Sequence, residues 1–149
     1  MTTLADKMTQ SPARERVISE CVTMIDEEVK SKSGLSGMAI KTGYSLVKAV
    51  SPKFVPDVVD AMLDDWVKNL DPFYADWQKS GGGKSFADYL SSRGPEAADK
   101  LLSVADSRAQ RTKHGSVKKM YERLRPSAKD HVEKALPRLG KLVEKAASA

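Results

Sequence analysis

The sequence has little of the material from which catalytic and metal sites are usually built. Its 149 residues include one cysteine, Cys21, and two histidines, His114 and His131. One cysteine cannot form an internal disulfide or a cysteine metal cluster. With two histidines, the sequence has very few residues from which a Ser-His-Asp site or a histidine cluster could be built. We therefore predict a protein that is not an enzyme and that holds no cofactor and no metal.

Long apolar runs are also lacking. No segment approaches the roughly 18 apolar residues of a membrane span. Residues 1–16, MTTLADKMTQSPARER, do not contain the apolar centre of a secretory signal. We expect a cytoplasmic protein without a transmembrane segment.

Strand patterning is missing as well, because no stretch alternates apolar and polar residues in the way of strands rich in Val, Ile or Thr. Apolar residues recur instead every three or four positions, as in 17–29 and 58–70, which predicts amphipathic helices. Cys21 falls in the first of these stripes, so it is predicted to be a core residue and not a nucleophile. With 40% apolar and 30% charged residues, the chain can bury one core. The sequence predicts an all-α fold, a single compact bundle of six or seven helices.

The second half of the chain resembles the first. Residues 16–29 align with 96–109, and residues 50–63 align with 124–137. The resemblance predicts two three-helix units, neither of which would close a core alone, so that each buries its apolar stripe against the other. The predicted units span about 14–70 and 95–146, with an aromatic and glycine-containing connector at about 71–94.

Positive charge is scarce in the first half and abundant in the second. Residues 1–75 have a net charge of −2 and residues 76–149 a net charge of +7. A basic surface of this kind either binds phosphate, anionic lipid or an acidic protein, or is an ordinary solvated helical surface. The residues predicted to form a basic face for a partner are Lys118, Lys119, Arg123, Arg125, Lys134, Arg138 and Lys141.

An acidic counter-face is predicted in the first half, at Asp57, Asp60 and Asp64. These positions align with basic residues of the second half, so that acidic and basic faces of two copies could pair in self-association. The alternative is two ordinary solvated faces, because exposed ion pairs contribute little. A magnesium site on the three carboxylates would need a second acidic or histidine-bearing helix, and the sequence offers none.

Aromatic residues gather in the middle of the chain, where Trp66, Phe73 and Trp77 recur at helical spacing. They form either an apolar groove for a ligand or a partner helix, or the core seam between the two halves. The general burial of large aromatic side chains favours the seam.

Two further signals are weak. The segment GGGKS lacks the earlier glycine and the strand of a phosphate-binding loop, so Ser85 is predicted to cap the following helix. His131 stands beside Asp130 on a basic helix and is predicted to be a solvated surface residue.

The segments LADK, KSGLSG, GYSLVKAVSP, VPDVVDAMLDDWV and ALPRLG resemble a family of small, uncharacterised bacterial proteins over nearly the whole chain. The resemblance implies a cytoplasmic, single-domain helical protein. It supplies no activity, cofactor or site residue.

These observations favour a non-enzymatic helical interaction or regulatory module that presents its basic face to a protein partner or to a second copy. The alternative is a nucleic-acid-binding protein that uses the same residues on phosphates with weak sequence preference, because no helix-turn-helix, zinc or RNA-binding motif is present. A third interpretation is a small apolar-ligand-binding protein or enzyme built on the aromatic residues, and no motif identifies a small molecule for it.

Overall fold

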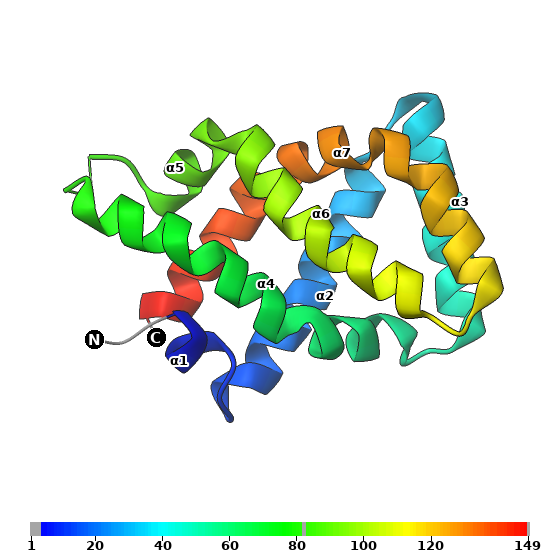
Figure 1. Cartoon of the computed structure of the whole chain (residues 1–149), viewed down its shortest axis with the longest axis horizontal. Coiled ribbons are helices and arrows are strands. Elements are labelled where there is room, and N and C mark those ends of the chain that lie inside the picture. The colour runs from blue at the N-terminus through cyan, green and yellow to red at the C-terminus, as the bar shows by residue number, and fades with distance from the viewer. Residues whose placement is uncertain (1–3, 82, 149) are drawn as a thin grey trace.

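The computed structural model describes residues 4–81 and 83–148, apart from the side chain of Val50, and over these ranges the chain forms seven α-helices and no strand (Figure 1). The helices are α1 (Leu4–Met8), α2 (Ala13–Ser31), α3 (Gly34–Val50), α4 (Phe54–Lys79), α5 (Phe86–Ser92), α6 (Gly94–Arg111) and α7 (Gly115–Ser148). The predicted all-α bundle is confirmed.

The core lies where α2, α4, α6 and the C-terminal half of α7 turn their apolar stripes toward one another. Val67 of α4, Ala97 of α6 and Val143 of α7 are buried there, together with Cys21 of α2. Residues three and four apart share one side of a helix, so each stripe becomes a continuous wall. The prediction that Cys21 belongs to the core is confirmed.

The short helix α1 also belongs to the core. Leu4 and Met8 are almost completely buried, in contacts that involve α4 and α7. Lys7 Nζ donates to the carbonyl oxygen of Ala147 at 2.6 Å, which ties α1 to the end of α7. A helix of five residues is too short for a periodic signal, so its place in the core does not follow from the sequence pattern.

Helix α4 continues through the start of the predicted connector. It runs to Lys79 with Pro72 inside it, so the division at about residue 71 is wrong for the helix boundary. Proline removes one backbone hydrogen bond, and the buried stripe continues across it, with Leu70 before and Phe73 after. After the break, Ser85 Oγ accepts the Asp88 N–H at 3.1 Å, which confirms Ser85 as the cap of α5.

Helices α5 and α7 approach each other closely at one glycine. A Cβ atom on Gly140 of α7 would lie 2.4 Å from the Ala87 Cα and 2.8 Å from the Ala87 Cβ of α5. The two residues beside this contact in α5, Phe86 and Leu90, are fully buried. The missing side chain of Gly140 therefore allows α5 to pack against α7.

Helix α7 has two roles. Figure 1 shows it changing direction along its length, and it contains Pro126 and Pro137, the residue type that usually kinks a helix. Its N-terminal part packs on α3, where Gly43 faces Met120. Its C-terminal half enters the core, where Leu136 is fully buried.

Two similar groups of side chains lie in the two halves of the chain. In the first, Tyr44 donates to Asp26 Oδ1, and Lys48 Nζ lies 3.8 Å from the same oxygen. In the second, three residues repeat this arrangement: Tyr121 donates to Asp106 Oδ1, which Arg125 Nε contacts at 2.8 Å. In each group burial, and then the hydrogen bond to the carboxylate, raise the pKa of the tyrosine. The internal duplication itself stays a prediction.

Candidate functional site

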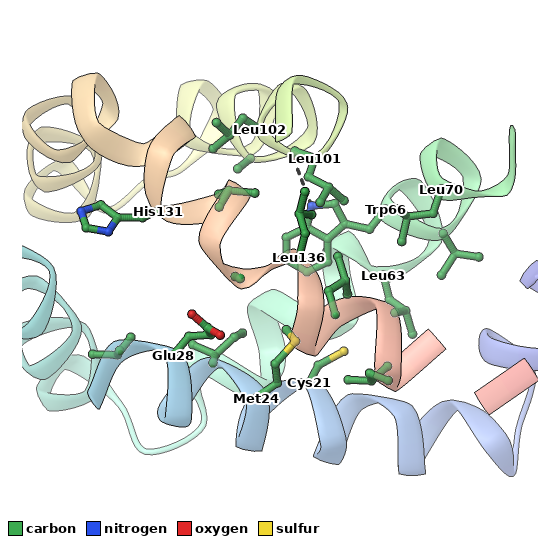
Figure 2. Close-up of a pocket in the computed structure, with 18 of the residues that line it drawn as sticks. Cys21, Met24, Glu28, Leu63, Trp66, Leu70, Leu101, Leu102, His131 and Leu136 are labelled. Carbon is green, nitrogen blue, oxygen red and sulfur yellow. Dashed lines mark hydrogen bonds between the residues drawn. The ribbon is translucent and has the colours of Figure 1, made fainter. Parts of the chain in front are cut away.

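A large apolar cavity lies between α2, α4, α6 and the C-terminal half of α7 (Figure 2). Its volume is about 290 Å³, whereas protein interiors are closely packed and hold few voids larger than a water molecule. Small-molecule sites have volumes of roughly 300–1,000 Å³. The cavity is therefore the main candidate for a functional site.

Four amphipathic helices build the wall of this cavity. Figure 2 shows their side chains converging on one space: Cys21 and Met24 from α2, Leu63, Trp66 and Leu70 from α4, Leu101 and Leu102 from α6, and Leu136 from α7. Trp66 Nε1 donates to the carbonyl oxygen of Leu101 at 3.2 Å, so the indole is held between α4 and α6. The wall is shaped by ordinary helical stripes that do not fill the space they enclose.

The single thiol faces this apolar interior and is not activated. Burial, with a smaller contribution from Glu20, raises the pKa of Cys21 to about 11. Because the thiolate is the nucleophilic form, Cys21 stays protonated and unreactive at neutral pH.

One end of the cavity is polar. Glu28, Lys32 and His131 line it there, and the Lys32 Nζ lies 3.2 Å from Glu28 Oε2 and donates to the His131 carbonyl oxygen at 3.1 Å. The side chains of Lys32 and Glu28 are 8% and 13% exposed. Glu28 and Lys32 are not among the predicted site residues, although the four-residue spacing of a Glu and a Lys at the end of a helical stripe indicates such a pair.

A polar hollow adjoins this end and shares the same three residues. Its volume is about 360 Å³, and Ser33, Ser36, Lys134 and Arg138 complete its lining. The two spaces therefore lie on either side of these shared residues. We call the charged group at this border the cationic mouth and define it by Lys32, Arg138 and Glu28.

Two cations in the cationic mouth share one carboxylate. Glu28 contacts Lys32 through Oε2, and its Oε1 lies 3.4 Å from Arg138 Nε. Arg138 Nη1 is a buried atom without a hydrogen-bond partner in the described part of the chain. The mouth therefore carries one excess positive charge and an unused donor, both of which suit an anionic group.

His131 is not a solvated surface residue, so that prediction is wrong. Its residue exposure is 8%, because it lies on the same side of α7 as Ala135, and its ring points away from the apolar side chains of the cavity toward the polar hollow (Figure 2). Burial first, and then the nearby Lys32, lower the pKa of His131, so its ring is neutral at neutral pH. The ring Nε2 lies 3.2 Å from Ser36 Oγ, and Nδ1 has no hydrogen-bond partner among the described residues.

The predicted basic face is divided between two parts of α7. Within the described ranges, three of its members form ion pairs: Arg125 with Asp106, Lys134 with Asp130 and Arg138 with Glu28. Lys118, Lys119 and Arg123 are exposed on the N-terminal part, and Lys141 is exposed near the other end. Only Arg138 belongs to the cationic mouth.

The predicted acidic counter-face is partly neutralised by Arg14 of α2. Arg14 contacts Asp60 Oδ1 and Asp64 Oδ1, each at 2.9 Å, while Asp57 is exposed nearby. These contacts hold α2 against α4. In the described ranges there is no group of His, Cys, Asp and Glu that could hold a metal ion.

The structure separates the three aromatic residues that were candidates for one groove. Trp66 lines the cavity. Phe73 is buried beneath Arg93, whose guanidinium carbon is 4.7 Å from the ring centre. Trp77 packs on Phe86 and donates to the Lys84 carbonyl oxygen at 2.7 Å.

A family of proteins of unknown function, DUF6918, matches residues 4–147. The chain belongs to this family. No curated protein and no solved structure matches the chain. The expected membership of an uncharacterised family is confirmed, and a bacterial source stays a prediction.

Proposed function

We propose that this chain is a binding protein for an amphiphilic molecule, which places its apolar tail in the cavity and an anionic head group at the cationic mouth. The observation that carries the proposal is the joining of an apolar interior of about 290 Å³ to a mouth with one excess positive charge.

The volume of the cavity favours a ligand that fills it. The wall of the cavity is almost entirely apolar. An apolar tail that entered it would remove this surface from water, at roughly 25 cal/mol for each Å² of apolar surface buried.

The mouth selects the head group. Lys32 and Arg138 have Glu28 as their shared carboxylate, and Arg138 Nη1 keeps a free donor in a buried position. A carboxylate or phosphate would accept that donor and balance the second cation, whereas an alcohol would balance no charge. The predicted ligand class is therefore a medium- or long-chain acid.

Titration with dodecanoate and with 1-dodecanol, both kept below the concentrations at which they aggregate, tests this function. Trp66 emission in a Trp77→Phe background is the readout, because only Trp66 lines the cavity. We expect dodecanoate to bind about tenfold more tightly than the alcohol, the equivalent of one charge-assisted hydrogen bond. Arg138→Gln should reduce this ratio to about one.

Lys141→Gln is the matched control, because Lys141 is exposed on the same helix and outside the mouth. It should leave the ratio unchanged. If neither compound alters the Trp66 emission or the melting temperature, the proposed function is wrong.

A second candidate function, hydrolysis of an acyl ester, rests on the distance of 3.2 Å between Ser36 Oγ and His131 Nε2 at the mouth. Against it stands His131 Nδ1, which has no acidic partner in the described residues to orient the ring as a base. We expect p-nitrophenyl decanoate to be cleaved at the same rate by the wild type and by Ser36→Ala. Loss of cleavage in Ser36→Ala would instead identify an enzyme.

A further inference from the structure

Helix α3 is a surface helix with apolar residues on two sides. Ile40 and Val47 face inward and are partly buried, while Leu35, Met38 and Leu46 are 93%, 60% and 57% exposed. Helical spacing places these three exposed residues on one side of α3, and we call them the α3 ridge. Large apolar side chains gathered on one exposed side of a helix are typical of an interaction surface.

The α3 ridge lies at the most basic end of the molecule. Figure 1 shows α3 beside the N-terminal part of α7 and the C-terminal end of α6. The segments 29–56 and 107–125, which form this end, contain 12 lysines and arginines and the acidic Glu122. Three of these cations, Lys32, Lys48 and Arg125, pair with carboxylates of adjoining segments, Glu28, Asp26 and Asp106. The other nine form no such ion pair among the described residues, so this end carries an excess of positive charge beside its exposed apolar side chains.

The first turn of α3 also borders the cavity mouth. Ser33, the residue before α3, and Ser36 in its first turn line the polar hollow. Leu35 lies between them in sequence and points its side chain almost entirely into solvent. The exposed apolar ridge thus begins next to the opening of the cavity.

We propose that this end of the protein docks on an anionic lipid bilayer, with the α3 ridge inserted among the head groups and the surrounding lysines and arginines on anionic lipids. This end exposes apolar side chains and positive charge. A membrane surface offers a partner for each of them, an apolar layer for the side chains and anionic head groups for the charge. None of the helices in the described ranges is long and apolar enough to span a bilayer. The docking is peripheral, with α3 lying along the surface.

Other occupants fit less well. A second copy seated on the α3 ridge would bring two strongly basic ends together, which repel each other. Nucleic acid would neutralise the lysines and arginines but would leave the apolar ridge uncovered. A bilayer covers both, and it would place the cavity mouth at the level of the head groups. This last step rests on the proposed function, because a docked mouth allows an amphiphile to enter without crossing water.

Co-sedimentation of the full chain with vesicles tests the docking. We expect binding to phosphatidylcholine vesicles that contain phosphatidylglycerol, weakening as salt is raised, and little binding to phosphatidylcholine alone. The double variant Met38→Glu, Leu46→Glu should lower the partition coefficient about 100-fold, because two apolar side chains no longer enter the bilayer. Both residues are exposed, so circular dichroism should show an unchanged fold.

The charge-matched control is Ala75→Glu, Gln78→Glu, at exposed positions near the other end of the molecule. It changes the net charge equally and should retain most of the vesicle binding. Equal binding by the ridge variant and the wild type would overturn the proposal. So would the absence of vesicle binding, including the case in which the protein instead binds a DNA duplex or forms a dimer that the ridge variant abolishes.

The docking and the ligand function can fail separately. Arg138→Gln, which should lose the preference for dodecanoate, leaves the α3 ridge intact and should bind anionic vesicles as the wild type does. The ridge variant should bind dodecanoate in solution with unchanged affinity. Failure of the dodecanoate titration alone overturns only the proposed ligand binding. Failure of the vesicle co-sedimentation alone overturns only the proposed docking.

Discussion

Gly140→Ala should destabilise the protein by about 3 kcal/mol, at the upper end of what one added methyl group costs in a packed interior. The new Cβ would lie 2.4 Å from the Ala87 Cα, a backbone atom that cannot rotate away. Helix α5 would have to move, and with it the fully buried Phe86 and Leu90. For a chain of this length we expect the melting temperature to fall by about 6–12 °C, measured by circular dichroism.

Gly115→Ala is the matched control, because a Cβ at Gly115 would meet nothing within 4 Å. Replacing glycine by alanine in a helix is otherwise favourable, so this variant should melt at the wild-type temperature or slightly higher. The variant Ala87→Gly, Gly140→Ala should stay destabilised, because the contact with the Ala87 Cα remains. Recovery in that double variant would show that the Ala87 Cβ and not its Cα makes the limiting contact, and an unchanged Gly140→Ala would show that α5 and α7 are not in such close contact.

The helical stripes could be predicted from the sequence because their signal is local. Spacings of three and four residues identified the buried sides of α2 and α4 and placed Cys21 in the core, and the cap residue Ser85 was found from the residue type that accepts a backbone hydrogen bond. Each of these features depends on neighbours within one or two turns. The structure agrees with them.

The features that depend on tertiary packing could not be predicted in the same way. The predicted connector begins at about residue 71, but the buried stripe of α4 continues on both sides of Pro72 and outweighs the hydrogen bond that this proline removes. The five-residue helix α1 is held by α4 and α7 and not by its own propensity. His131 is buried because α7 turns that side inward at the mouth, although its sequence neighbours are charged.

The candidate site follows the same division. Trp66 was singled out from the sequence, and it does line the cavity, but its predicted companions Phe73 and Trp77 pack elsewhere. The cavity exists because the apolar stripes of four helices do not fill the space between them. The pattern of one helix does not predict how much space is left when the four pack together. The exposure of the α3 ridge could not be predicted for a related reason. Apolar residues in a helix predict burial, but the sequence pattern does not show whether the same chain supplies the covering partner.

Glu28→Gln should destabilise the protein by about 3 kcal/mol, because it leaves the buried Lys32 without its carboxylate and removes the same partner from the half-exposed Arg138. The side chains keep nearly the same size, so the loss reports the charge and not the packing. Urea unfolding measures it. Glu27→Gln, an exposed neighbour on the same helix with the same charge change, should have almost no effect on stability.

The same substitution should act on ligand binding in the opposite direction. With Glu28 neutral, the cationic mouth carries two uncompensated positive charges, so the carboxylate of dodecanoate becomes their counter-ion. We expect Glu28→Gln to bind dodecanoate more tightly than the wild type does, while its affinity for 1-dodecanol stays unchanged. Saturating dodecanoate should then restore much of the lost stability, since a ligand that binds only the folded state stabilises it by an amount that grows with the logarithm of its concentration divided by Kd. If Glu28→Gln weakens dodecanoate binding as much as it weakens dodecanol binding, the mouth does not recognise an anionic head group.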